Sequence, residues 1–165
     1  MNQEIVKLAQ QLGQVLGSNN YQVTTAESCT GGGVSTAITE IAGSSAWFSA
    51  GFVTYSNEIK EKVLNVPSNI LDSYGAVSHQ VVEAMLRGAI SISAADVGVA
   101  ISGIAGPTGA APGKPVGTIC FAVGSTSKVN TYTEYFEGNR SEIREQAVVT
   151  ALSYLLDFCS LEQAV

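Results

Sequence analysis

The chain has 165 residues, of which 45% are hydrophobic and only 13% are charged, and its net charge is −6 at pH 7. This balance excludes a disordered chain and suits one globular domain over residues 1–165, large enough to bury a core without disulfides. The acidic charge also argues against a general nucleic-acid surface, so we expect no nucleic-acid partner.

Helices and strands alternate in the first half of the chain. An amphipathic helix is expected from about Gln3 to Leu16, ending near Gly17. The next expected elements are a strand in residues 21–27, a short helix in 31–43, a strand in 46–56, a helix over 57–64 and a short helix opened by Pro67.

The second half predicts a long helix, three strands and a final helix. Ser78 is expected to cap the helix over residues 78–93, and residues 96–102 have the continuous apolar pattern of a strand covered on both faces. A Gly/Pro-rich loop, residues 103–115, leads to strands in 116–124 and 129–137, joined as a hairpin around Ser125 to Lys128. The final helix starts at Asn139, which with Glu142 resembles a capping box.

This order of elements predicts a three-layer α/β/α sandwich with a mixed, mostly parallel sheet. In such sheets, ligands bind at the loops that follow the carboxyl ends of the strands. We therefore expect the site at the loops after "TTAE", "VTYS" and "AISG".

Three widely spaced cysteines and a single histidine give neither a disulfide framework nor a metal-binding pattern, so we expect a reducing cytoplasm and no metal. The N-terminal segment lacks the basic start and continuous apolar run of a signal peptide. The most apolar stretch, residues 89–106, contains Asp96 and several Ser and Gly residues and is a poor membrane span. These features predict a cytoplasmic protein with no membrane partner.

The loop "ESCTGGG", residues 27–33, places Ser28 and Cys29 between a strand and a helix. Free N–H groups at a helix start can stabilise a phosphate or the oxyanion of a tetrahedral intermediate, and a serine there can attack a substrate. The loop is neither the phosphate-binding GxxxxGK[ST] motif nor a GxSxG elbow. A plain glycine turn capped by Ser28 and Thr30 fits the spacing equally well.

A serine nucleophile needs a base, and the chain offers two candidates. His79 falls in the first turn of a helix, where a surface position is expected. Lys60 follows a strand in "YSNEIK", and a desolvated lysine can lose its proton and act as a base. On sequence alone, the favoured interpretation of Lys60 is a solvated helix cation that pairs with Glu58 or Glu61.

Two later stretches offer ligand contacts. Ser102 ends the buried strand before "GIAGPTG", whose glycines either permit close approach of a ligand or simply connect two strands. Arg140 and Arg144 lie four residues apart at the start of the last helix and would clamp a phosphate or a carboxylate. Pairing of these arginines with Glu137 and Glu145 is an equal alternative.

Cys29 is the rival nucleophile, because a helix N-terminus can lower the pKa of a thiol. Since no histidine lies beside it, we expect a packed cysteine that shapes the turn, and we expect Cys120 and Cys159 in the core. Glu27 is expected either to accept hydrogen bonds as a structural carboxylate or to orient Lys60, and the sequence does not choose between these roles.

Six stretches together resemble the CinA carboxy-terminal family of competence/damage-inducible proteins: "TAESCTGG", "GFVTYSNEIK", "GAVS", "SGIAGPTG", "KPVGTI" and "GNRSEIR". The resemblance covers essentially the whole chain in the family's order. Stand-alone members of this length are nicotinamide-nucleotide amidases. The resemblance therefore implies a CinA-like fold and a homodimer that hydrolyses nicotinamide mononucleotide (NMN) to nicotinate mononucleotide (NaMN) and ammonia in NAD salvage, without a cofactor.

The same resemblance implies the site residues. Ser28 would be the nucleophile, and Tyr55 and Lys60 its proton-transfer partners. Backbone N–H groups around residues 30–32 would hold the oxyanion, and the two arginines would hold the 5′-phosphate. Substrate contacts are expected at Thr30, Gly31, Gly32, Asn57, Ser102, Gly103, Arg140 and Arg144.

One segment, "TGAAPG" at residues 108–113, departs from the family's pattern, in which an acidic residue and more glycine are common. Ribose recognition is expected to differ there. Two other function classes stay open: a non-catalytic nucleotide-binding module, and an interaction protein in DNA uptake or damage response.

Overall fold

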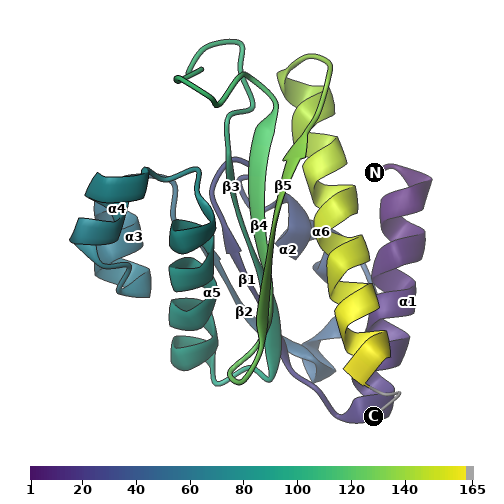
Figure 1. The fold of residues 1–165 in the computed structure, drawn as a ribbon. Helices are drawn as coiled ribbons and strands as arrows, with labels where there is room; N and C mark the ends of the chain where they lie inside the picture. The colour runs from purple at the N-terminus through teal and green to yellow at the C-terminus, as the bar shows by residue number, and fades with distance from the viewer. Residues whose placement is uncertain (163–165) are drawn as a thin grey trace.

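A five-stranded sheet forms the middle layer of the structure, a computed structural model that describes residues 1–162 (Figure 1). The elements in chain order are α1 (Gln3–Asn19), β1 (Val23–Glu27), α2 (Gly33–Thr39), the 3-10 turn η1 (Ser44–Ala46), β2 (Phe48–Val53), α3 (Asn57–Leu64), α4 (Ser68–Tyr74), α5 (His79–Ser93), β3 (Val97–Gly103), β4 (Thr118–Ser125), β5 (Val129–Tyr135) and α6 (Arg140–Glu162).

The strands are ordered β2–β1–β3–β4–β5. β1 pairs in parallel with both β2 and β3, whereas β4 is antiparallel to β3 and to β5. The predicted mixed, mostly parallel sheet and the hairpin around residues 125–128 are confirmed, since four of the five strands run in one direction and only β4 runs against them. β4 returns directly beside β3 without a crossover helix. The carboxyl ends of β1, β2 and β3 therefore lie at one edge of the sheet, together with the start of β4.

Helices cover both faces of the sheet, which confirms the three-layer sandwich (Figure 1). α1, α2 and α6 enclose one core cluster with Val99, Ile101 and Phe121 of the sheet. α5, supported by α3 and α4, encloses a second cluster with Ala100 and Ala122. Neighbouring residues of β3 thus point to opposite faces, and both faces are apolar, as the continuous apolar run of that strand predicts.

Local capping sets the helix boundaries. Ser78 accepts a hydrogen bond from the Val81 N–H (3.3 Å), as expected. The capping box at α6 is confirmed with Asn in place of Ser or Thr: the Asn139 N–H donates to Glu142 Oε2 (2.7 Å) and the Glu142 N–H donates to Asn139 Oδ1 (3.1 Å). The predicted end of α1 near Gly17 is wrong, because Asn20 takes the left-handed cap conformation (φ 53°) and the helix continues to Asn19.

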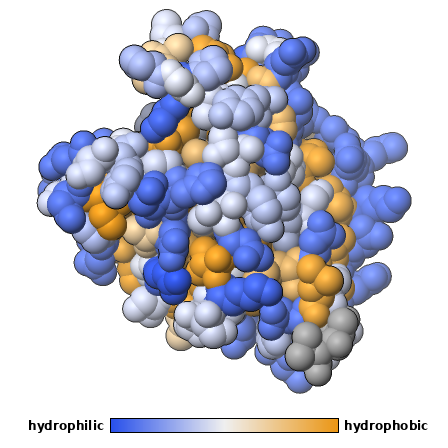
Figure 2. Space-filling view, in the orientation of Figure 1, coloured by the Kyte–Doolittle hydropathy of each residue, from blue (hydrophilic) through white to orange (hydrophobic). Residues whose placement is uncertain are grey.

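Apolar residues on the face shown in Figure 2 form separate patches between polar ones. Among the helices described over residues 1–162, none combines the length and the apolar character needed to cross a membrane.

Candidate active site

Three loops meet at the carboxyl edge of the parallel strands. Residues 28–32 follow β1, residues 54–56 follow β2, and residues 104–117 connect β3 to β4. The registers Glu27↔Val53 and Glu27↔Ile101 place the ends of these strands side by side. The sheet topology therefore brings together the loops that the sequence singled out.

The first loop is a tight turn that fixes Ser28 at the end of β1. The Ser28 N–H donates to the Ile101 carbonyl (3.0 Å), and the Ser28 carbonyl accepts from the Gly31 N–H (3.0 Å). Gly31 and Gly32 have φ of +60° and +95°, where a side chain would be strained. A Cβ on Gly33 would lie 2.8 Å from Val148 Cγ2 of α6. Two glycines thus serve the turn and the third serves helix packing.

Lys60 is buried against Ser28. Its side chain is among the largest that are fully buried, with the residue 1% exposed. Lys60 Nζ lies 3.1 Å from Ser28 Oγ and donates hydrogen bonds to the backbone carbonyls of Thr54 (2.9 Å) and Tyr55 (3.1 Å). The favoured interpretation of Lys60 as a solvated cation is wrong: α3 packs its amine inward, and Glu58 pairs with Lys62 instead.

This environment shifts the Lys60 amine towards its neutral form. Burial lowers the pKa of Lys60 from 10.5 to about 8. A neutral amine has two N–H groups and one lone pair, whereas the two carbonyls can only accept hydrogen bonds. When both N–H groups donate to these carbonyls, the lone pair is left for the third neighbour, the Ser28 hydroxyl. The geometry therefore suits transfer of the Ser28 proton to Lys60.

Glu27 is a structural carboxylate. It is fully buried and accepts five hydrogen bonds, from the N–H groups of Gly32, Val34 and Ser35 and from the hydroxyls of Thr30 and Ser35. These donors belong to the turn and the first residues of α2. The carboxylate therefore accepts hydrogen bonds from N–H groups that the first turn of the helix leaves unpaired, and its negative charge interacts favourably with the helix dipole. Of the two roles expected for Glu27, the structure supports the first: within residues 1–162 it makes no hydrogen bond to Lys60.

Cys29 is packed rather than poised for attack. Burial, aided by the negative charge of Glu27, raises the pKa of the Cys29 thiol from 9.0 to about 12. The thiol is therefore protonated at neutral pH, and a thiol is a far weaker nucleophile than a thiolate. The expected burial of Cys120 and Cys159 is confirmed.

The two arginines brace the loops. Arg144 donates from Nε to the Cys29 carbonyl and from Nη2 to the Thr30 carbonyl, both at 3.1 Å. Arg140 donates to the Gly106 carbonyl (2.8 Å) and to the Tyr55 hydroxyl (3.1 Å). Neither arginine forms an ion pair within residues 1–162, so the alternative of pairing with Glu137 and Glu145 is wrong. The phosphate clamp stays a prediction.

Tyr55 contacts the Ser28–Lys60 pair (the dyad) through its backbone carbonyl. Its carbonyl accepts a hydrogen bond from Lys60 Nζ, whereas its hydroxyl accepts one from Arg140 and the residue as a whole is 60% exposed. In the described part of the chain the phenol has no hydrogen bond to Ser28 or Lys60. The Tyr55 side chain thus links the second loop to the start of α6 through its hydrogen bond with Arg140.

The N–H groups of the first loop differ in availability. The Gly31 N–H donates to Ser28, the Gly32 N–H to Glu27 and the Gly33 N–H to Thr30. Among residues 1–162, the N–H groups of Cys29 and Thr30 have no acceptor in another residue, and that of Cys29 faces its own thiol. The turn itself uses the N–H groups of Gly31 and Gly32, and the oxyanion contact expected around residues 30–32 stays a prediction.

The other expected contacts lie at the same edge. Asn57 opens α3 with an exposed side chain, and Ser102 is buried at the end of β3. Gly103 is needed for packing, since a Cβ there would lie 2.2 Å from Ile119 Cδ1. The sequence analysis missed Thr54, whose carbonyl holds Lys60 and whose buried hydroxyl has no hydrogen-bond partner in the described chain. Its only signal was its place directly after β2.

Known proteins match nearly the whole chain. The nicotinamide-nucleotide amidohydrolase PncC of Pseudomonas putida is 53% identical over 152 residues, which cover 92% of this chain and 95% of that protein. The PncC of Escherichia coli K12 is 50% identical over 153 residues, with 92% and 93% covered.

Solved structures share the fold over the same length. A CinA superfamily protein of Klebsiella pneumoniae superposes with a TM-score of 0.92 at 34% identity, covering 97% of this chain and 99% of that one. The competence/damage inducible protein CihA of Agrobacterium tumefaciens gives 0.91 at 41% identity, covering 95% and 96%. Residues 5–159 also match the family model described as the CinA C-terminal domain. The chain therefore belongs to the CinA C-terminal domain family.

Proposed function

We propose that the protein hydrolyses the carboxamide of NMN to NaMN and ammonia, a step in NAD salvage, with Ser28 as nucleophile and Lys60 as base. The observation that carries the proposal is the buried Lys60 amine 3.1 Å from the Ser28 hydroxyl. Relatives at about half identity carry the name nicotinamide-nucleotide amidohydrolase, which supports the choice of substrate.

The first half-reaction forms an acyl-enzyme. Neutral Lys60 accepts the Ser28 proton as Ser28 Oγ bonds to the carboxamide carbon, which gives a tetrahedral intermediate with a negative oxygen. The Lys60 ammonium then protonates the departing nitrogen, the C–N bond breaks, and ammonia leaves. The nicotinoyl group remains as an ester on Ser28.

The second half-reaction restores the enzyme. Lys60, neutral again, accepts a proton from water as the water oxygen bonds to the ester carbon. The C–O bond to Ser28 breaks, Ser28 recovers a proton from Lys60, and the nicotinate product ionises. The direct contact between Lys60 and Ser28 makes a relay through the Tyr55 phenol unnecessary, so we assign this phenol to positioning Arg140.

The oxyanion would be stabilised by the N–H groups of Cys29 and Thr30. Both follow the nucleophile directly and have no acceptor in another residue among residues 1–162. Donors placed in advance stabilise developing charge without reorganisation. Arg144 supports this arrangement, because it holds the carbonyls of the same two residues.

Release of ammonia from NMN tests the proposal. Wild type should release ammonia, whereas Ser28→Ala and Lys60→Ala should be inactive, and Cys29→Ala should retain most activity. An inert wild type that binds NMN would instead support a non-catalytic binding module. Full activity in Ser28→Ala together with none in Cys29→Ala would move the nucleophile to the thiol.

We further propose that the enzyme is a homodimer, as its family resemblance implies, and that it is cytoplasmic. The three buried free cysteines suit a reducing compartment. Light scattering on the purified protein tests the dimer, and a monomer at micromolar concentration would contradict it.

A further inference from the structure

A cavity lies at the same edge of the sheet as the Ser28–Lys60 pair but is lined by other residues. It has a volume of about 400 Å³ and lies between the start of α5 and the 104–117 loop. Figure 2 shows the surface notched between the lobe of α3 and α4 and the lobe of that loop. The proposed reaction uses none of the residues named for this cavity, which include Ser78, His79, Lys114, Thr118, Cys120 and Thr133.

Two sequence motifs without a role in the reaction meet at this cavity. "GAVS" contributes Val77 and Ser78, and "KPVGTI" contributes Lys114 and Thr118. The two motifs are far apart in the sequence, and Lys114 Nζ joins them by donating to the Tyr74 carbonyl just before "GAVS" (3.1 Å). Their convergence indicates a site rather than two unrelated turns.

A row of polar residues connects this cavity to the nucleophile. Ser28 and Ser102 directly follow the paired residues Glu27 and Ile101, so they are neighbours on one face of the sheet. Ser102 pairs with Cys120, and Cys120 pairs with Thr133. Cys120 thus lies two strands from Ser28, roughly 10 Å at the usual strand spacing. The carboxamide and phosphate of one nucleoside monophosphate can bridge such a span.

The cavity is suited to an anion. Lys114 and His79 are its ionisable nitrogen groups, and no carboxylate is among its described lining residues. Lys114 has no ion-pair partner within residues 1–162 and uses one donor on Tyr74, so two of its N–H groups are free. This is unusual in a chain that carries a net charge of −6.

We propose that the phosphate of the nucleotide substrate binds in this cavity on the two free N–H groups of Lys114. The hydroxyls of Ser78 and Thr118 and the ring nitrogens of His79 already have hydrogen-bond partners in the described chain, so Lys114 is the group that would hold the charge. This inference rests on the proposed function for the identity of the nucleotide. It is an alternative to the expected phosphate clamp by Arg140 and Arg144, each of which uses two of its five N–H donors on the active-site loops.

The first test measures phosphate binding without catalysis. His79 is the only histidine of the chain, so its imidazole gives a single set of NMR signals. Titration of inorganic phosphate at constant pH should shift these signals saturably in wild type and in Ser28→Ala. Lys114→Gln should weaken the binding about 10-fold to 100-fold, since a charge-assisted hydrogen bond is lost.

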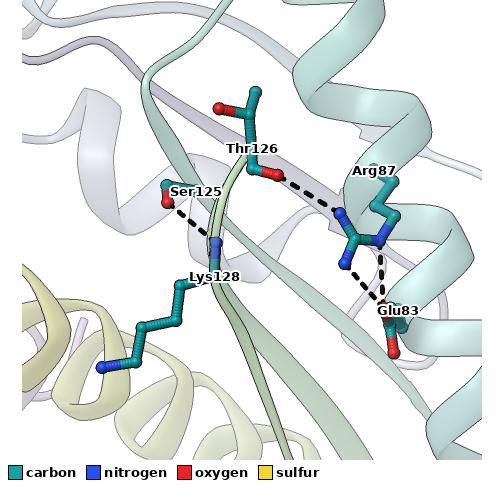
Figure 3. A network of polar contacts seen from close by, with 5 residues as sticks. All are labelled: Glu83, Arg87, Ser125, Thr126 and Lys128. Atoms are coloured by element: carbon teal, nitrogen blue, oxygen red, sulfur yellow. Dashed lines mark hydrogen bonds and ion pairs between the residues drawn. The ribbon is translucent and has the colours of Figure 1, made fainter.

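The second test separates phosphate recognition from chemistry. In Lys114→Gln the KM for NMN should rise about 10-fold to 100-fold while kcat changes little, and kcat/KM for nicotinamide riboside, which lacks the phosphate, should not change. Lys128→Gln is the matched control. Lys128 lies in the turn at the far end of β4, and its ammonium makes no contact with the residues drawn in Figure 3.

The outcomes distinguish this inference from the proposed function. Loss of the phosphate effect in Arg140→Gln but not in Lys114→Gln would overturn the inference and return the phosphate to the arginines. Unchanged phosphate binding and unchanged NMN kinetics in Lys114→Gln would also overturn it, even if NMN is hydrolysed. Phosphate binding that depends on Lys114 in a wild type that does not hydrolyse NMN would uphold the anion site and refute the proposed function.

Discussion

Replacement of Lys60 by Met removes the proposed base while keeping an unbranched, apolar side chain in a buried position. Lys60 is 1% exposed and its amine contacts Ser28 and two backbone carbonyls, so no other described group is placed to take over its role. We expect kcat/KM for NMN to fall about 100-fold to 10,000-fold, which is the rate acceleration that a positioned general base usually provides. Lys62→Met is the matched control on the same helix, and its exposed pair with Glu58 should contribute little.

The pH dependence follows from the lowered pKa of Lys60. With a pKa of about 8, about one molecule in eleven holds the neutral amine at pH 7, against about one in three thousand for an ordinary lysine at 10.5. Burial therefore raises the fraction of free base at neutral pH by about 300-fold. The kcat/KM of wild type should rise about tenfold per pH unit below 8 and level off above about 9.

The free energy of unfolding should also depend on pH because of the lowered pKa of Lys60. Between pH 8 and 10.5 the unfolded chain holds a proton on Lys60 that the folded chain has lost. The free energy of unfolding should therefore increase with pH across this window, by up to about 3 kcal/mol relative to Lys60→Met, and the difference should be constant below it.

An ammonia-release assay across pH 6–10 and denaturant titrations of the same proteins measure both effects. Retention of more than a tenth of wild-type activity by Lys60→Met would refute Lys60 as the base. A flat pH profile between 6 and 9 would refute the lowered pKa as the source of the free base, even if Ser28→Ala is inactive.

Three further substitutions test the residues that hold the turn containing Ser28. Glu27→Gln should lower the free energy of unfolding by about 2–4 kcal/mol, because an amide cannot replace a carboxylate that accepts five hydrogen bonds; a loss too small to resolve by urea denaturation would contradict this. Gly33→Ala should cost about 1–3 kcal/mol through its approach to Val148, and thermal melting should show partial recovery when Val148→Ala is added. Arg144→Lys keeps the charge but loses the contact with two carbonyls, so kcat should fall in steady-state assays. Arg87 forms an exposed ion pair with Glu83 (Figure 3), and the control substitution Arg87→Lys should leave kcat unchanged.

Local sequence signals predicted most of the fold. Helix caps at Ser78 and Asn139 depend on residues within three positions, and the alternation of strands and helices depends on short apolar patterns, so both can be found without tertiary information. The end of α1 was missed because Gly17 and Asn20 are both acceptable stop signals, and only the left-handed backbone at Asn20 decides between them. The order of the strands could not be predicted, because pairing of β3 with both β1 and β4 depends on the paths of the connections and not on either strand.

Some features of the site likewise depend on local sequence, and others depend on tertiary packing. The sequence by itself determined that a serine stands between a strand and a glycine turn, since positive φ at Gly31 and Gly32 is a local requirement. Only the tertiary structure decided that Lys60, 32 residues away, is buried against this serine, and that Arg144, 115 residues from Cys29, holds the turn. Burial sets the pKa of Lys60, and burial depends on which helix packs beside which strand. An exposed lysine and a buried base can therefore share the same local sequence.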